Sequence, residues 1–149
     1  MIKVQSFTFN PFLENTYVLY DETNEAIGRR SKIIAEILGQ VPELTFNETF
    51  GAFYNTIIFR DGSLKAHQRL KIADPKVQQL VDKWVNQPIA LDKRFVYYLL
   101  AAKGVCVVPI SSFCSELQGF RVTLLEEDED KLEKTFTAIR DGIVEYLRS

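Results

Sequence analysis

Residues 104–147, GVCVVPISSFCSELQGFRVTLLEEDEDKLEKTFTAIRDGIVEYL, contain two short apolar stretches followed by a long amphipathic segment. The stretches 105–110 and 120–125 are rich in β-branched and aromatic residues, which predicts two strands close together in the chain. In the segment after them, apolar side chains recur three or four positions apart and so share one face of a helix: Leu132, Phe136, Ile139, Ile143 and Leu147. This order predicts helices packed on a sheet.

Three further helices are expected upstream. Residues 27–38 place isoleucines on one helical face, and Gly39 follows where a C-terminal cap is expected. Asp74 and Pro75 form a strong helix start, because the carboxylate can cap the helix and proline suits its first turn. A later helix is expected to be capped by Asp92 and to end at Gly104. The side chains predicted to face the core from the last two helices are Val77, Leu80, Val81, Trp84, Val85, Phe95, Val96, Leu99 and Leu100.

Further strands are predicted in the first half of the chain. Residues 2–9 and 15–21 are interrupted by Asn10-Pro11, which is typical of a β-hairpin with a longer loop. Residues 44–49 fit a short strand and residues 53–59 a better-buried one. Together these elements predict an α+β fold, a two-layer sandwich with helices packed on a small mixed or antiparallel sheet, preceded by an N-terminal hairpin.

The composition narrows the classes of partner. The chain has 149 residues, 46% of them hydrophobic, and a formal net charge of −2, so neither nucleic acid nor an anionic membrane is expected as a partner. The apolar runs are too short to span a bilayer, and the N-terminus does not resemble a secretory leader. Cys106 and Cys114 are the only cysteines, which indicates reduced thiols in a cytoplasmic protein. Cys106, in an apolar stretch, is expected to be buried.

Four motifs occur in order over about four-fifths of the chain: RRSKIIAEI at 29–37, GAFY at 51–54, GVCVVPISSF at 104–113 and GFRVTLLE at 119–126. Residues from about 28 to 149 thereby resemble the C-terminal small domain of fold-type I aminotransferases, which depend on pyridoxal 5′-phosphate (PLP). The resemblance is closest to the alanine and aspartate aminotransferase group. It implies an aminotransferase (transaminase) small domain.

The N-terminal segment resembles a different family. Residues 1–21, MIKVQSFTFNPFLENTYVLYD, are similar to the first two strands of metallo-β-lactamase-fold hydrolases. That family carries an HxHxDH metal motif further on, whereas the only histidine here is His67, so no metal site is expected. The two resemblances meet near Ala26 and Ile27. They predict a fused chain with a foreign hairpin segment at 1–26 and the aminotransferase small domain at 27–149.

The aminotransferase resemblance implies a substrate site. Arg121 matches the family arginine that grips the α-carboxylate of an amino or keto acid, and a planar guanidinium suits a carboxylate because it donates two parallel hydrogen bonds. Gly51 and Ala52 match the position where backbone passes close to substrate, and Ser111 and Ser112 match a loop beside it. From the residues alone, Arg121 is more simply interpreted as a solvated side chain on a half-exposed strand. Gly51 and Ala52 fit a turn before a buried strand equally well.

The groups that bind PLP in the resembled family are expected to be missing from this chain. PLP chemistry needs a lysine amine, a cradle for the phosphate and a carboxylate at the pyridinium nitrogen. In the resembled family these come from the large domain, and no lysine of this sequence lies in a matching motif. The chain alone is therefore expected to hold no cofactor, to have no catalytic residue and to be inactive, as a truncated small domain that keeps at most weak carboxylate binding at Arg121.

Two alternatives remain open. The chain could be a non-catalytic structural or interaction module, because a small domain without its large domain should expose apolar surface that self-association or the hairpin would cover. It could also act in trans with a separate chain that supplies the large domain. A metallohydrolase is the weakest interpretation, because the metal ligands are absent.

Overall fold

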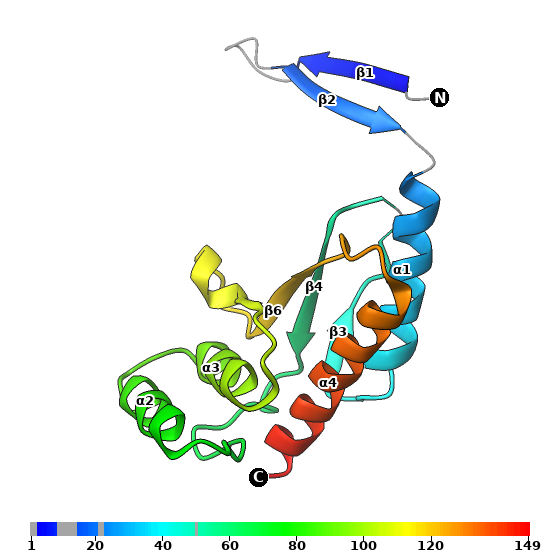
Figure 1. Cartoon of the computed structure of the whole chain (residues 1–149). Coiled ribbons are helices and arrows are strands. Elements are labelled where there is room, and N and C mark those ends of the chain that lie inside the picture. Colours follow the sequence, from blue (N-terminus) through cyan, green and yellow to red (C-terminus); the bar gives the residue numbers. More distant parts are fainter. Residues whose placement is uncertain (1–2, 9–14, 21–22, 50) are drawn as a thin grey trace.

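The computed structural model of this chain describes residues 3–8, 15–20, 23–49 and 51–149 (Figure 1). Four α-helices in this part of the chain pack on a four-stranded sheet, and a two-stranded sheet precedes them. The elements are β1 (Lys3–Thr8), β2 (Asn15–Tyr20), α1 (Thr23–Leu38), β3 (Leu44–Phe46), β4 (Tyr54–Phe59), α2 (Pro75–Val85), α3 (Leu91–Lys103), β5 (Val108–Pro109), the 3₁₀ turn η1 (Ile110–Phe113), β6 (Gly119–Thr123) and α4 (Glu129–Leu147). The predicted α+β sandwich is confirmed.

The larger sheet has the strand order β3-β4-β6-β5, and each neighbouring pair is antiparallel. The central pair, β4 and β6, is in register from Tyr54 opposite Thr123 to Ile58 opposite Gly119. The strand β5 contributes only two residues, of which Val108 lies opposite Arg121. The sheet is therefore antiparallel, which agrees with the prediction of a mixed or antiparallel sheet.

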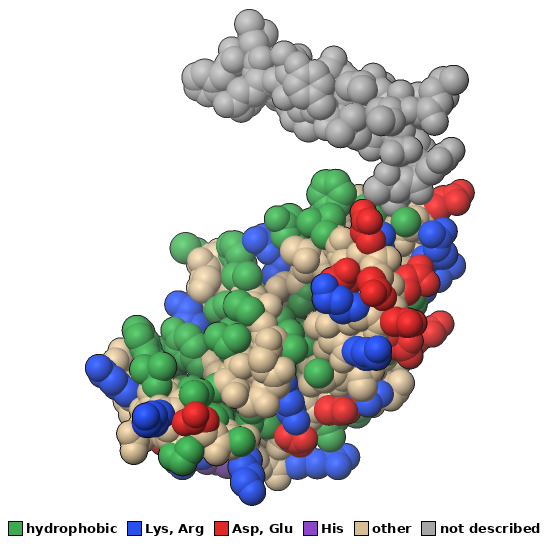
Figure 2. All heavy atoms as spheres, in the orientation of Figure 1, with side chains coloured by type: hydrophobic (Ala, Val, Ile, Leu, Met, Phe, Trp, Pro, Cys, Tyr) green, Lys and Arg blue, Asp and Glu red, His purple; other side chains and the backbone are tan. Residues whose placement is uncertain are grey.

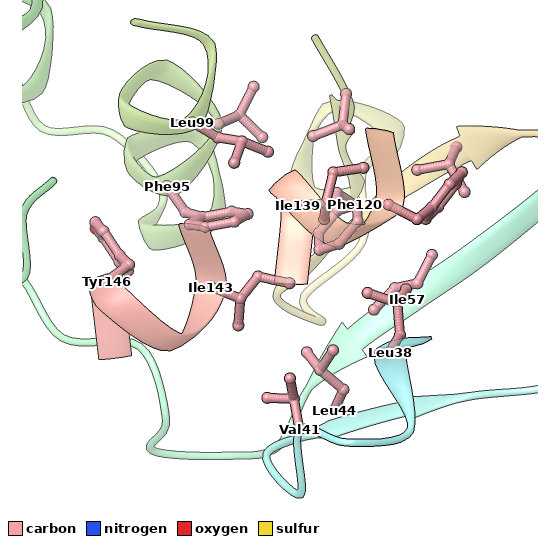
Figure 3. Close-up of a cluster of buried hydrophobic side chains, with 14 of the residues drawn as sticks. Leu38, Val41, Leu44, Ile57, Phe95, Leu99, Phe120, Ile139, Ile143 and Tyr146 are labelled. Carbon is pink, nitrogen blue, oxygen red and sulfur yellow. The ribbon is translucent and has the colours of Figure 1, made fainter. Parts of the chain in front are cut away.

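The hydrophobic core lies between one face of this sheet and three helices. Alternate residues of the central strands are buried on that face, among them Ile57 and Phe59 of β4 and Phe120 of β6. The helix α1 runs beside α4, and α3 packs against α4 from its other flank (Figure 1). Figure 3 shows the core side chains of these helices meeting those of the sheet.

The predicted helix signals act as expected at several ends. The Asp74 carboxylate accepts hydrogen bonds from the backbone N–H groups of Lys76 and Val77, at 2.7 and 3.3 Å, and so caps α2. Gly104 ends α3 in the left-handed conformation, with φ 71°. The terminal helix has Asp128 as its cap, and the side chains predicted to face the core from it are buried, with Leu147 partly so.

Six sequence-based predictions are wrong in detail. Leu80 is exposed, because α2 packs mainly on α3 at the rim of the fold. Trp84 contacts the Tyr97 ring of α3 but is still about half exposed there, and Leu100 of α3 is exposed as well. The predicted strand 105–110 pairs only at Val108–Pro109, since residues 105–107 line a cavity beside α4. Cys106 is consequently exposed rather than buried. The predicted strand 44–49 ends at Phe46.

The N-terminal hairpin is confirmed at the level of its backbone. β1 and β2 pair antiparallel from Lys3 opposite Tyr20 to Thr8 opposite Asn15, as a sheet separate from the larger one. The predicted Asn10-Pro11 loop lies outside the described residues. The helix α1 begins at Thr23, so it runs through the predicted boundary between 26 and 27, and that boundary stays a prediction. No helix in the described ranges combines the length and apolar character that crossing a membrane requires.

Burial of Tyr146 makes stability depend on alkaline pH. Desolvation raises the pKa of Tyr146 to about 12, against the opposing charge of Arg94. Below pH 10 the phenol is protonated in both the folded and the unfolded state, so the contribution of Tyr146 to the free energy of unfolding does not change with pH there. As the pH rises from 10 toward 12, only the unfolded state loses the proton, and the free energy of unfolding falls by about 1.4 kcal/mol per pH unit.

We therefore expect the Tyr146→Phe variant, which keeps the ring but cannot ionise, to lose less stability than the wild type above pH 10. Urea unfolding at pH 9, 10 and 11, followed by circular dichroism, measures the difference. The pKa of Tyr98 is also raised by burial, so the variant should retain some alkaline dependence. Equal declines in both proteins would contradict the assignment to Tyr146.

Candidate functional site

The candidate site lies on the face of the sheet that points away from the core. On this face Thr56 of β4 is opposite Arg121 of β6, and Tyr54 is opposite Thr123. Val108 of β5 adjoins Arg121 from the other side. The core side chains are on the opposite face, so Arg121 stands in the middle of a surface that none of the four helices covers. The alternation predicted for residues 120–125 therefore holds, with Val122 and Leu124 buried.

Two aromatic rings lie against the Arg121 guanidinium. Its central carbon lies 4.5 Å from the centroid of the Tyr54 ring and 4.1 Å from that of the Phe113 ring. Both contacts are within the range of cation–π attraction. We call Tyr54, Arg121 and Phe113 the arginine clamp. Two rings this close leave the N–H groups on the remaining sides of the guanidinium for a ligand.

The charge of Arg121 is not neutralised within the described part of the chain. The ion pairs there join Arg29 to Glu129, Lys103 to Glu145, Lys131 to Glu126 and Arg140 to Asp141. None of them includes Arg121. A planar cation that forms no ion pair within the described residues can bind a carboxylate through two parallel hydrogen bonds.

The predicted loop residues beside the site have different environments. Ser111 is partly buried, and its hydroxyl and backbone N–H donate to the Asp92 carboxylate at 2.6 and 2.8 Å. Its hydroxyl is thus engaged within the protein. Ser112 is exposed in the turn η1, one residue before Phe113.

The other predicted pocket residues lie at the end of the same sheet face. Gly51 has a φ of 155°, a conformation that a side chain disfavours, and Ala52 is exposed. The next residue, Phe53, accepts a hydrogen bond at its carbonyl from the N–H of Leu124, at 2.9 Å. This bond places Gly51 and Ala52 near the end of β6, beyond Tyr54 and Thr123.

Sequence reasoning did not identify three residues at or near the candidate site, namely Tyr54, Phe113 and Asp92. Tyr54 and Phe113 stand in the quoted GAFY and PISSF motifs, but nothing in the sequence indicated that they flank Arg121. Asp92 was predicted to cap a helix. Ala90 is the N-cap residue instead, and Asp92 is a fully buried side chain within α3. An acidic residue in an otherwise apolar helix face was the available signal for a buried polar role.

One cavity in the described part of the chain lies on the α4 side of β6. It has a volume of about 220 Å³ and adjoins β6 between residues 105–108 and α4. Its lining includes Arg121, Cys106 and Glu126 but no lysine. No group of three or more His, Cys, Asp or Glu side chains suited to a metal ion occurs in this part of the chain either.

Apolar side chains surround the arginine clamp on the surface. Phe53, Leu117 and Val108 are exposed together with the two clamp aromatics. Figure 2 shows hydrophobic side chains gathered on the left of the visible face, over the region that carries η1, α3 and α2 in Figure 1. Exposed apolar surface around a polar group is typical of an interface or a ligand site.

Comparisons with known proteins point to one class of enzyme. The chain is 39% identical over 129 residues to an uncharacterized aminotransferase of Methanocaldococcus jannaschii, covering 87% of this chain and 30% of that protein. A crystal structure of an aminotransferase from Escherichia coli matches with a TM-score of 0.56 over 81% of this chain and 24% of its own, at 16% identity, and shows a shared fold. No family model matches. The chain thus spans about a third of the length of its curated relative.

Proposed function

We propose that this chain, which is similar to part of an aminotransferase, is the small domain of a PLP-dependent aminotransferase and binds the carboxylate of an amino or keto acid at Arg121. The observation that carries the proposal is the arginine clamp, a guanidinium that lies against Tyr54 and Phe113 and forms no ion pair within the described residues. Thr56 and Thr123 border it on the same sheet face.

In this proposal the chain contributes substrate binding, and catalysis requires another domain. PLP would supply the chemistry of amino-group transfer, and its lysine and phosphate cradle would come from residues outside those described. No catalytic step is assigned to the residues of this chain. The exposed apolar side chains around the clamp would face the second domain, whether it belongs to the same polypeptide or to a partner chain.

Isothermal titration with alanine and pyruvate tests the carboxylate site. We expect a dissociation constant on the order of 1 mM for the wild type. Arg121→Ala should weaken binding at least about tenfold, because a charge-assisted pair is lost. Arg121→Lys should also weaken it, because an ammonium lacks the planar fork.

The Arg148→Ala variant is the matched control, since Arg148 is an exposed arginine at the end of the terminal helix. It should leave the affinity unchanged. Equal affinity of the wild type and Arg121→Ala would sink the proposed role of Arg121.

A second function is favoured by the exposed apolar surface. Phe53, Phe113 and Leu117 are each about half exposed, which suits a structural or interaction module that associates with itself or with a large-domain partner. The same titration separates the two functions, because a flat titration of the wild type would leave only the interaction module.

We further propose that residues 1–26 are a segment of separate origin joined to this domain and that the protein is cytoplasmic. The separate pairing of β1 with β2, apart from the larger sheet, supports the first point. The second rests on cysteine content, since only two occur and neither is in a disulfide.

A further inference from the structure

The clearest unexplained group near the arginine clamp is the Asp92 carboxylate. Asp92 is fully buried in α3 and belongs to none of the ion pairs in the described residues. A buried charge without a counter-charge is destabilising unless hydrogen bonds compensate it. The hydrogen bonds of Asp92 therefore indicate which part of the structure its buried carboxylate stabilises.

Every group that bonds to this carboxylate is a donor. Oδ1 accepts from the Ser111 hydroxyl at 2.6 Å and from the Lys93 N–H at 2.7 Å. Oδ2 accepts from the Ser111 N–H at 2.8 Å and from the Gly119 N–H at 3.5 Å. Both oxygens therefore need lone pairs, which only a carboxylate provides on each side.

These bonds close the base of one loop. Ser111 and Gly119 are the two ends of the segment 111–119, and Gln118 adds a further tie by accepting the Asp92 N–H at its side-chain oxygen, at 3.1 Å. Phe113 lies within this segment and covers one side of the Arg121 guanidinium. The Asp92 side chain thus connects α3 to the loop that carries half of the arginine clamp.

We propose that Asp92 is a positioning residue, whose carboxylate fixes the segment 111–119 so that Phe113 lies against the Arg121 guanidinium. The inference deepens the proposed function, since the clamp is the proposed carboxylate site. Loosening the loop lets Phe113 move away and leaves the guanidinium less ordered for carboxylate binding. The position of Phe113 is a property of the protein without ligand, so it can be measured whether or not carboxylates bind.

The decisive substitution is Asp92→Asn, which preserves shape and volume. With the amide nitrogen at the Oδ2 position, its NH₂ group faces the backbone N–H groups of Ser111 and Gly119. With the nitrogen at the Oδ1 position, it faces the Lys93 N–H, and the Ser111 hydroxyl must turn to accept. At least one backbone donor therefore loses its acceptor in either orientation, which disrupts the base of the loop. Ser111→Ala is a milder variant that removes one of the four bonds. Asp74→Asn is the matched control, because asparagine caps a helix as well as aspartate does and the same charge is lost.

The readout is the NMR signal of the Arg121 Nε–H group, assigned by its absence in Arg121→Lys. Ring currents from Tyr54 and Phe113 should shift this proton upfield in the wild type. Asp92→Asn should move the signal to the position found in Phe113→Leu, with circular dichroism still showing a folded protein. Ser111→Ala should move it part of the way, and Asp74→Asn should not move it. If Asp92→Asn fails to fold, the shift of the Arg121 signal in Ser111→Ala tests the positioning role instead.

Carboxylate affinity provides the second arm. Asp92→Asn should weaken alanine and pyruvate binding about fivefold, which corresponds to loss of one cation–π contact and its ordering effect. An unmoved Arg121 signal in folded Asp92→Asn, or in folded Ser111→Ala if Asp92→Asn is unfolded, would overturn the positioning role. If the wild type binds no carboxylate while the signal shifts as expected, the proposed function fails and the positioning role stands.

Discussion

Replacing Phe95 with alanine is expected to lower the free energy of unfolding by about 3–5 kcal/mol. The Phe95 ring is fully buried and lies 5.2 Å from the ring of Phe59, 5.7 Å from that of Phe120 and 5.3 Å from that of Tyr146, measured between centroids. It thus joins α3 to two strands and to α4. Removing it leaves a cavity between both layers, and domains of this size have about 5–15 kcal/mol in total.

Urea unfolding monitored by circular dichroism and by the fluorescence of the single tryptophan measures this loss. Leu100→Ala is the control, because Leu100 is on the same helix but 45% exposed. It should cost less than about 1 kcal/mol. Comparable losses for the two variants would show that the aromatic cluster is not the centre of the core.

Replacing Gly119 with alanine is the second large effect, expected at about 3 kcal/mol. A Cβ at this position would lie inside van der Waals contact with the carbonyl oxygen of Ile57 and 3.0 Å from the Cα of Ile58. Both are backbone atoms of β4, so they cannot yield as a side chain would. The central pairing of β4 with β6 must shift, and the Gly119 N–H must move relative to Asp92.

The same substitution at Gly28 is the matched control with the opposite expected sign. Gly28 is in α1, and a Cβ there would meet nothing within 4 Å. Gly28→Ala should therefore stabilise the protein by about 0.5–1 kcal/mol, because alanine loses less backbone freedom in a helix. Thermal or urea unfolding of both variants gives the comparison, and a stable Gly119→Ala protein would refute the close approach of the strands.

The core face of most elements was predictable because it depends on local periodicity. Phe136, Ile139 and Ile143 recur at helical spacing and are buried, and the alternation of Val122 with its neighbours identified which side of β6 faces the core. The same reasoning failed at Leu80 and Trp84. Their spacing is helical too, but burial needs a neighbouring layer, and α2 packs mainly on α3 at the rim of the fold.

The sequence identified Arg121 as a candidate residue but did not indicate which side chains surround it. Arg121 was identified from the motif GFRVTLLE, and the structure places it on an uncovered sheet face. Tyr54 contacts the Arg121 guanidinium from β4, 67 positions earlier in the chain. Phe113 contacts it from η1, so its position depends on the path of a loop. Sequence spacing carries no information about either.

By itself, the sequence determined the kinds of element, their order, the antiparallel or mixed α+β class and the cation suited to a carboxylate. These follow from side-chain periodicity, capping residues and functional groups, which act over a few neighbouring positions. The tertiary structure alone decided that Asp92 reaches Ser111 and Gly119, which are 19 and 27 positions away. The physical reason is that a buried carboxylate needs donors, and only the packing of α3 against β6 and η1 determines which donors come within reach.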